Sequence, residues 1–316
     1  MKNDMIWGYL IHLSSNMWGD SEDSNAYDVY RPVLATEDDV WKQTVDFLPD
    51  QGFNTLVIDV GDGIQYESHP EISIPGAWSK DKLKAELDRL RSIGLTPLPK
   101  LNFSACHDAW MKEYSRMLST KPYYAFCKDI IEEVAELFGY PALFHLGLDE
   151  EVPEHQTEFL FSCCRQGELW WHDAYYLFNL CEKVGCRPWV WADLHWKLKD
   201  KYLEKMPKSV MQSNWWYRSM PKKPDGTFVD DRVNAYHDLE RAGFDQIPTC
   251  SSVFQFDSAD QTMKTLKQDI SPEHLKGYMT APWFQTTDKH RYALLNDANL
   301  FGHAKRAYYP EPSKKG

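Results

Sequence analysis

The chain has 316 residues, with 35 Lys and Arg against 47 Asp and Glu, so its formal net charge is −12. Nucleic acids and anionic membrane surfaces bind basic patches, and this acidic balance argues against either as the main partner. With 43% hydrophobic and 26% charged residues, the composition is that of a globular protein, which excludes disorder over most of the chain.

The sequence also contains no stretch of about 18 apolar residues that would span a membrane. Residues 1–4 lead directly into an apolar run rather than a signal sequence, so we expect a soluble, cytoplasmic protein. Seven cysteines form no CxxC pair, and we interpret them as reduced thiols that mostly fill the core. Aromatic residues make up 14% of the chain and often stand beside polar residues, an arrangement that suits stacking on sugars.

Eight short apolar runs follow one another and are typical of buried strands. They span residues 6–13, 54–60, 96–101, 142–148, 187–192, 209–215, 247–253 and 277–283. Amphipathic stretches that predict helices separate most of them, at 37–51, 80–93, 123–138, 168–184, 233–242, 259–269 and 292–303. The stretch at 197–206 is short for such a helix, and the seventh run is the weakest strand pattern.

The order helix, glycine stop, strand recurs along the chain. In 80–93, for example, Leu83, Leu87 and Leu90 have helical spacing, and Gly94 ends the helix before the next strand. Eight such units close into a barrel. The alternative, an open doubly wound sheet, usually carries a glycine-rich phosphate loop after its first strand, where this chain has SSNMWGD. We therefore predict an α/β fold, a single (β/α)8 TIM barrel over residues 1–316 with a frayed tail at about 310–316.

The active site of a TIM barrel lies at the carboxyl ends of its strands, so polar residues there are the candidates. After the first run these are Asn16, Trp18 and Asp20, and the second run contributes Asp59 and Asp62. Alternation along the fourth run places His145, Gly147 and Asp149 on one face. Glu150 joins them only if the strand ends there and the backbone turns.

The adjacent carboxyl groups of Asp149 and Glu150 are the sharpest signal in the chain. Glycosidic cleavage needs one protonated carboxyl group and one anion, and two neighbouring carboxylates raise each other's proton affinity. A helix N-terminus that favours acidic residues is the structural alternative for a bare Asp-Glu pair. The preceding His145 and Gly147, at a predicted strand end, favour a functional role.

The run His145-Leu-Gly147-Leu-Asp149-Glu150 resembles the H-x-G-x-D-E signature of the family 20 glycoside hydrolases, the β-N-acetylhexosaminidases and their relatives. This resemblance implies that Glu150 is the general acid/base and that Asp149 orients the substrate's own acetamido group, which acts as nucleophile. It further implies that the sugar pocket is walled by tryptophans and that Tyr217 holds the acetamido oxygen. The tryptophans at matching strand ends are Trp191, Trp215 and Trp283.

The chain departs from the family pattern at two strands. The first predicted strand has no Arg to grip sugar hydroxyls, and Lys100 in the third stands where the family more often has an acidic residue. We expect Lys100 and Asn102 to donate to sugar hydroxyls, or Lys100 to pair with Asp59 or Asp149 as a buried ion pair. We place Asp59, His145 and Asp193 in the substrate-binding set as well.

The sequence thus predicts a hydrolase that acts on a β-linked sugar, with a carbohydrate as its partner and no metal or other cofactor. The resemblance implies that this sugar is an N-acetylhexosaminide. A substrate without an acetamido group would need another carboxylate, such as Asp193, as base or nucleophile. One rival function is a metal-dependent sugar isomerase or epimerase that uses Asp193, His195 and Glu150. Another is a carbohydrate-binding barrel without catalysis.

Overall fold

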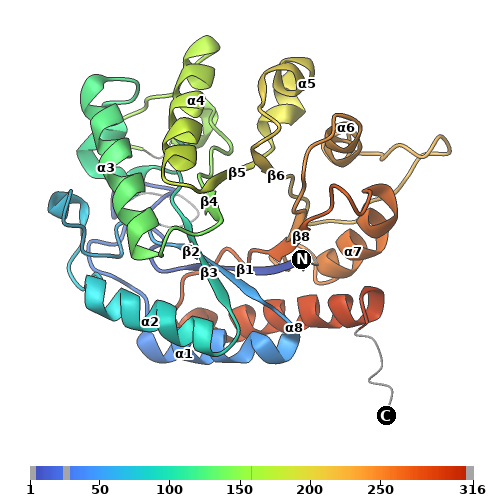
Figure 1. Ribbon diagram of the computed structural model, residues 1–316, viewed down its shortest axis with the longest axis horizontal. Helices are drawn as coiled ribbons and strands as arrows, with labels where there is room; N and C mark the ends of the chain where they lie inside the picture. The colour runs from blue at the N-terminus through green and yellow to red at the C-terminus, as the bar shows by residue number, and fades with distance from the viewer. Residues whose placement is uncertain (1–4, 24–28, 158, 311–316) are drawn as a thin grey trace.

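The computed structural model describes residues 5–23, 29–157 and 159–310, which form the predicted (β/α)8 TIM barrel (Figure 1). Its parallel strands are β1 Ile6–His12, β2 Thr55–Asp59, β3 Thr96–Lys100, β4 Leu143–His145, β5 Arg187–Trp191, β6 Met211–Ser213, β7 Thr249–Cys250 and β8 Gly277–Thr280. Its helices are α1 Asp38–Phe47, α2 Lys80–Ser92, α3 Lys121–Leu137, α4 Glu168–Lys183, α5 Leu194–Lys205, α6 Ala235–Arg241, α7 Ser258–Asp269 and α8 Arg291–Tyr308. The expected frayed tail lies outside the described residues from 311 on. No helix in the described ranges is both long and apolar enough to cross a membrane.

The strands are hydrogen-bonded in the order β6-β5-β4-β3-β2-β1-β8-β7. Isolated parallel bridges, Gln212 to Gln246 and Trp215 to Thr249, join the two end strands β6 and β7 and close the barrel. Every predicted strand is confirmed, although β4, β6 and β7 are shorter than the apolar runs that predicted them. The short predicted helix at 197–206 is part of α5, which begins earlier and is kinked at Leu198.

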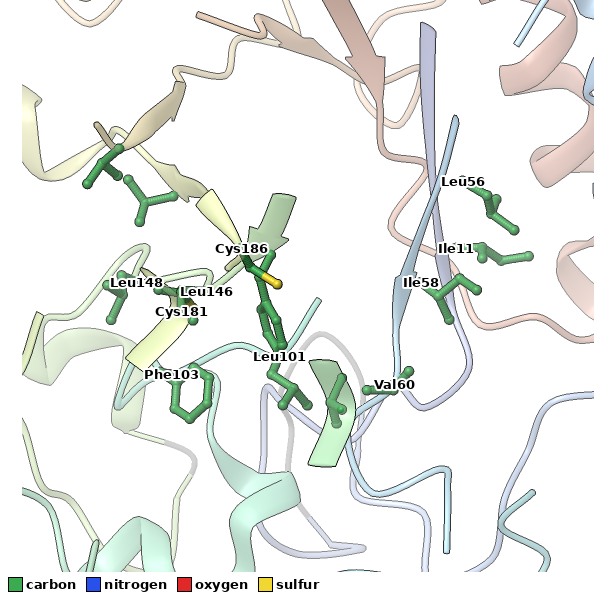
Figure 2. Packing of buried hydrophobic residues seen from close by; sticks show 14 of the residues in the cluster. Ile11, Leu56, Ile58, Val60, Leu101, Phe103, Leu146, Leu148, Cys181 and Cys186 are labelled. Atoms are coloured by element: carbon green, nitrogen blue, oxygen red, sulfur yellow. The ribbon is translucent and has the colours of Figure 1, made fainter. Parts of the chain in front are cut away.

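The main core lies between the strands and the surrounding helices. Outward-facing strand residues such as Ile11 and Ile58 belong to this cluster, and Figure 2 shows Ile11 beside Leu56 and Ile58. In the same view Cys181 of α4 lies beside Leu146. Burial of each large aliphatic side chain stabilises the fold by about 1.5–3 kcal/mol. This outer layer fixes the helices, and through them the loops at both ends of the barrel.

The barrel interior is built in two different layers. Strand register aligns Leu10, Val57 and Leu98 across β1, β2 and β3, and these residues belong to a compact apolar cluster. Two residues further along the strands, the same register aligns polar residues of β1 to β4: His12, Asp59, Lys100 and His145. A charged layer therefore lies directly below the carboxyl ends of the strands.

Candidate active site

A pocket of about 420 Å³ opens at the carboxyl end of the barrel, within the usual range for small-ligand sites. Asp149 and Glu150 lie in its wall, as the strand-end rule predicts. Aromatic side chains form most of the remaining wall. These are Trp18, Trp215, Tyr217, Phe254 and Trp283, with His107 and His155 beside the two carboxyl groups.

The backbone after β4 is a tight turn that places both carboxyl groups in the pocket. Gly147, Leu148 and Glu150 have φ angles of 68°, 67° and 53°, in the left-handed region that non-glycine residues rarely adopt. Strand alternation therefore ends at His145, and the expectation that it continues to Asp149 is wrong. The backbone does turn at Glu150, which the sequence analysis required for Glu150 to join the site. Such strained residues gather at functional sites.

Side chains that lie just after β3 and β5 hold this turn in place. Asn102 accepts a hydrogen bond from the Leu148 N–H at 3.2 Å and donates one to Asp149 Oδ1 at 2.8 Å. Asp193 Oδ2 accepts the N–H of Glu150 at 2.8 Å. A Cβ at position 147 would lie 2.0 Å from Asn102 Oδ1, so only glycine fits there. The motif glycine is thus explained by close packing against Asn102.

The two carboxyl groups differ in their proton affinity. Burial opposes ionisation of Asp149, but His107, Lys100 and the Asn102 hydrogen bond outweigh it and hold the pKa of this carboxyl well below its ordinary value. Burial, together with the Asp149 charge, raises the pKa of Glu150. Asp149 therefore gives up its proton more readily than Glu150, which is the direction of difference that acid catalysis needs.

His107 lies between these carboxyl groups. Its Nδ1 is 3.3 Å from Asp149 Oδ1, and its Nε2 is 3.6 Å from Glu150 Oε2. Burial alone would lower the pKa of His107, but the neighbouring Asp149 carboxylate raises it. The proximity of His107 in turn favours the anionic form of Asp149.

The aromatic wall is a connected group of rings. Trp215 and Tyr217 stack with ring centroids 5.1 Å apart and planes 23° apart. Trp283 Nε1 donates a hydrogen bond to the Tyr217 hydroxyl at 2.9 Å, so the hydroxyl oxygen is an acceptor and its proton is directed elsewhere. Trp18 meets Trp283 edge-on at 6.2 Å. Flat rings in this arrangement suit the apolar face of a sugar.

Several predicted substrate-binding residues lie behind the pocket lining rather than in it. Lys100 is fully buried and forms an ion pair with Asp59, so the ion-pair alternative is the one observed. His145 is buried beneath Trp191, at 4.5 Å between ring centroids, and burial lowers its pKa well below the ordinary value. Asn102, Trp191 and Asp193 are also buried and stand outside the lining. Trp215, Tyr217 and Trp283 lie where they were expected.

The sequence motif Asp193-x-His195 does not bring two ligands to one point. His195 Nε2 lies 3.4 Å from Asp238 Oδ2 on α6, whereas Asp193 supports Glu150. Burial and the nearby Asp149 and Glu150 raise the pKa of Asp193 to about 7. Among the described residues, possible metal-ligand atoms converge instead at His107, Asp149 and Glu150. Asp193 therefore acts in this site as a backbone support with a weakly acidic carboxyl group.

Sequence reasoning named Trp18 only as a strand-end candidate, and it assigned no role to several other lining residues, among them His107, His155 and Phe254. His107 and Trp18 follow the third and first strands, so their position was a usable signal, but nothing in the local pattern separated them from capping or packing residues. His155 lies in a short 3₁₀ helix, Pro153–Gln156, and Phe254 follows β7. These two come from long loops, whose path no periodic pattern encodes.

No protein-family model matches the chain, and no curated protein matches it in sequence. Solved structures do match its fold. It is similar to the β-N-acetylhexosaminidase of Bacteroides fragilis, with 14% identity, a TM-score of 0.63 and coverage of 93% of this chain and 65% of that one. It is similar to the GH20 exo-β-N-acetylglucosaminidase of Vibrio harveyi, at 13% identity, a TM-score of 0.64 and coverage of 99% and 55%.

Dispersin B also matches, with 15% identity, a TM-score of 0.58 and coverage of 95% of this chain and 99% of that one. The chain therefore spans less than two thirds of the Bacteroides and Vibrio proteins and nearly all of Dispersin B. At such identities the likeness shows the fold alone. The fold of this barrel is similar to that of these Bacteroides and Vibrio structures, and this is the fold that the H-x-G-x-D-E resemblance implied.

Proposed function

We propose that this protein is a glycoside hydrolase that cleaves a β-linked 2-acetamido sugar, with Glu150 as general acid/base. The observation that carries the proposal is that Asp149 and Glu150 stand together in the wall of one aromatic-lined pocket, where their surroundings lower the pKa of Asp149 and raise that of Glu150. A carboxylic acid that keeps its proton can donate it to the leaving oxygen, while the neighbouring anion supports positive charge in the transition state.

The nucleophile in this proposal is the substrate's acetamido oxygen. Besides Asp149 and Glu150, the carboxylate in the described pocket lining is the exposed Glu154 on its rim. Asp193 stands behind Glu150, which disfavours it as a direct base or nucleophile. Without a second free carboxylate near the reacting carbon, attack from within the substrate accounts best for the geometry.

Tyr217 and Asp149 are the groups that would orient the acetamido group. Burial raises the pKa of Tyr217 well above its ordinary value, so the phenol keeps its proton. Because its oxygen accepts from Trp283, that proton is available to the acetamido oxygen. Ionised Asp149 would accept the acetamido N–H and stabilise the oxazolinium charge that forms. Trp215 and Trp283 would then hold the sugar ring by stacking.

The likeness to solved structures supports the substrate class, since the Bacteroides protein is named a β-N-acetylhexosaminidase and the Vibrio protein an exo-β-N-acetylglucosaminidase. We propose a carbohydrate ligand, a single catalytic barrel and a cytoplasmic location on this basis and on the sequence. A stable pocket with two differently tuned carboxyl groups favours catalysis over carbohydrate binding alone.

The test is release of the aglycone from aryl β-glycosides, including the GlcNAc, GalNAc and glucose derivatives. The proteins compared are the wild type, Glu150→Gln and the matched control Glu273→Gln, which makes the same change at an exposed residue before β8. We expect hydrolysis of a 2-acetamido substrate, retained in Glu273→Gln and reduced roughly 100- to 10,000-fold in Glu150→Gln. Chelator should not lower the activity. Equal activity in wild type and Glu150→Gln contradicts the proposed role of Glu150, and a preference for the glucose derivative contradicts the acetamido mechanism.

A further inference from the structure

The aromatic wall of the pocket continues outward to its rim. Tyr217, which stacks on Trp215, also stacks on Phe254 of the loop after β7, with ring centroids 6.3 Å apart and planes 28° apart. Tyr217 is buried, whereas Phe254 is 62% exposed although it belongs to the pocket lining. Single exposed apolar side chains are common on protein surfaces, but a flat ring at the mouth of a pocket is a typical contact for a sugar. This row of rings therefore extends the aromatic wall beyond the buried part of the site.

Arg218 brings a positive charge to the outer ring. Its guanidinium carbon lies 4.9 Å from the centre of the Phe254 ring, which is a cation–π contact. Arg218 is exposed and forms no salt bridge within residues 5–23, 29–157 and 159–310. Other arginines of this acidic chain, such as Arg89, Arg165 and Arg291, are paired with carboxylates. A guanidinium at a pocket rim without such a partner is available to an anionic group of the ligand.

Hydrogen bonds hold this ring and this guanidinium in place. Arg218 lies in the loop after β6, and Phe254 lies in the loop after β7. Gln255 joins the two loops, because its Oε1 accepts the Ser219 N–H at 3.0 Å and its Nε2 donates to Ser219 Oγ at 2.9 Å. These bonds are made by the direct neighbours of Arg218 and Phe254. A ligand that binds to groups already held in position pays less conformational entropy, so the rim is preorganised.

Glu150 and the outer ring share the open part of the pocket. Both line it, and the side chain of Glu150 is 33% exposed, against 11% for that of Asp149. In the proposed reaction Glu150 donates its proton to the oxygen of the leaving group, so the leaving group has to lie beside Glu150. The buried rings then hold the sugar whose bond is cleaved, and the exposed Phe254 is left for the leaving group.

We propose that Phe254 and Arg218 form a binding site for the leaving group, and that this leaving group is an anionic sugar. The sugar would stack on Phe254, while its carboxylate or sulfate accepts parallel N–H hydrogen bonds from the Arg218 guanidinium. This inference rests on the proposed function, because it identifies the leaving group of the proposed hydrolysis. The substrate class is then an acidic oligosaccharide, in which a 2-acetamido sugar is β-linked to a uronate or to a sulfated sugar.

The kinetic test compares disaccharides that differ only at carbon 6 of the reducing sugar. Their non-reducing sugar is the 2-acetamido sugar that the aryl glycosides identify, and their reducing sugar is glucose, glucuronic acid or glucose 6-sulfate, each in 1→3 and 1→4 linkage. We expect kcat/KM for an acidic disaccharide to exceed that for its neutral counterpart by about 10- to 100-fold, the range for charge-assisted hydrogen bonds. A higher value with glucuronic acid identifies a carboxylate as the ligand, and a higher value with the sulfate identifies a sulfate ester.

The variants separate the charge from the ring. Arg218→Gln should remove the preference for the acidic disaccharide, and Arg218→Lys should keep part of it, because an ammonium group retains the charge but not the parallel N–H bonds. Phe254→Ala should lower kcat/KM for the acidic and neutral disaccharides alike, by about 3- to 10-fold. Arg116→Gln and Phe161→Ala are the matched controls. Arg116 lies over the exposed Phe161 ring outside the pocket lining, so these changes should leave every value as in the wild type.

Binding without turnover separates this inference from the proposed function. In calorimetry, Glu150→Gln should bind the preferred acidic disaccharide about 10- to 100-fold more tightly than the neutral one, and Glu150→Gln/Arg218→Gln should lose this difference. That result, with a wild type that hydrolyses none of the substrates, would contradict the proposed function and support the anionic ligand. Hydrolysis with equal kcat/KM for neutral and acidic disaccharides, or a preference that Arg218→Gln retains, would overturn this inference alone.

Discussion

The two layers of the barrel interior differ sharply in chemistry although they lie on the same strands. The lower layer aligns Leu10, Val57 and Leu98, while the upper layer aligns His12, Asp59, Lys100 and His145. The lower layer contributes stability by apolar burial alone. The upper layer needs paired charges, since a buried ion without a partner is strongly unfavourable. The comparison shows that polar, paired residues are confined to the interior layer next to the pocket, whereas the layer below is apolar.

Lys100 forms the buried ion pair that makes the upper layer possible. Burial opposes the ionisation of Asp59, but Lys100 and then His12 hold its pKa below the ordinary value. The same cation also favours the ionised form of Asp149, in the wall above. Lys100, which was predicted to bind sugar, thus affects the site through its charge, although it lies behind the pocket lining.

The largest effect is expected for Lys100→Met. This change leaves the Asp59 carboxylate buried without its cation and should lower the free energy of unfolding by about 3–5 kcal/mol. Chemical denaturation at pH 7 measures it. The double variant Asp59→Leu/Lys100→Met is the control, because replacing both partners by apolar groups should recover most of the loss. A double variant no more stable than Lys100→Met would show that the pair is not the source.

Leu98→Ala tests the lower layer in the same assay. Removal of this buried side chain should lower the free energy of unfolding by about 2–5 kcal/mol through lost burial and a cavity. We expect the pH dependence of stability to match that of the wild type, because no charge changes. A shifted pH profile would mean that the two layers are coupled rather than distinct.

Asn102→Ala should have a smaller effect on stability, and its consequence lies in the site. The variant leaves the Leu148 N–H and Asp149 without their partner, which should lower the free energy of unfolding by about 1–3 kcal/mol. Because the turn then loses its support, kcat for the aryl glycoside should fall more than KM rises. Asn296→Ala, which makes the same substitution on α8, is a control outside the pocket. An unchanged kcat in Asn102→Ala would show that Asn102 does not position Asp149 for catalysis.

At pH 4 Asp193→Asn should have the smallest effect of these variants, and its growing effect at higher pH sharpens the contrast with Asp59. Burial raises the pKa of Asp193 to about 7. Between about pH 4 and pH 7 the unfolded chain releases this proton while the folded chain keeps it, so the wild type loses stability as pH rises. Relative to the wild type, Asp193→Asn should gain up to about 1.4 kcal/mol per pH unit across this window. Denaturation at pH 4, 5, 6 and 7 measures this, and a constant difference would contradict the raised pKa.

Much of the fold was predictable because strands, helices and their glycine stops are encoded locally. The apolar runs identified every strand, including the two-residue β7, although the hydrogen-bonded ladders are shorter than the runs. Apolar character continues past β4 because Leu146 and Leu148 pack in the outer core, after the ladder has ended. Local pattern therefore located the elements but not their last residues.

The site was predictable at its centre and less so around it. Asp149 and Glu150 lie at a strand end with a recognisable motif, and they reach the pocket. Asp59 and Lys100 also end strands, but both are buried rather than exposed in the pocket. Whether an inward-facing residue lines the pocket depends on whether other side chains cover it, and this is decided by packing across the whole barrel. His155 and Phe254 reach the pocket on loops, whose course is set by tertiary contacts.

The weak pairing between β6 and β7 determines where the barrel opens locally. Strands β1 and β2 pair over five residues, whereas β6 and β7 share only isolated bridges in the described structure. Local opening starts where the fewest ladder hydrogen bonds have to break, so amide hydrogens near Gln212 and Thr249 should exchange with solvent before those of β1 and β2. Trp215, which walls the pocket, lies on this seam. Transient opening of the barrel there would loosen the aromatic wall first. The Asp149–Glu150 turn would stay in place, because Asn102 and Asp193 hold it from the ends of β3 and β5.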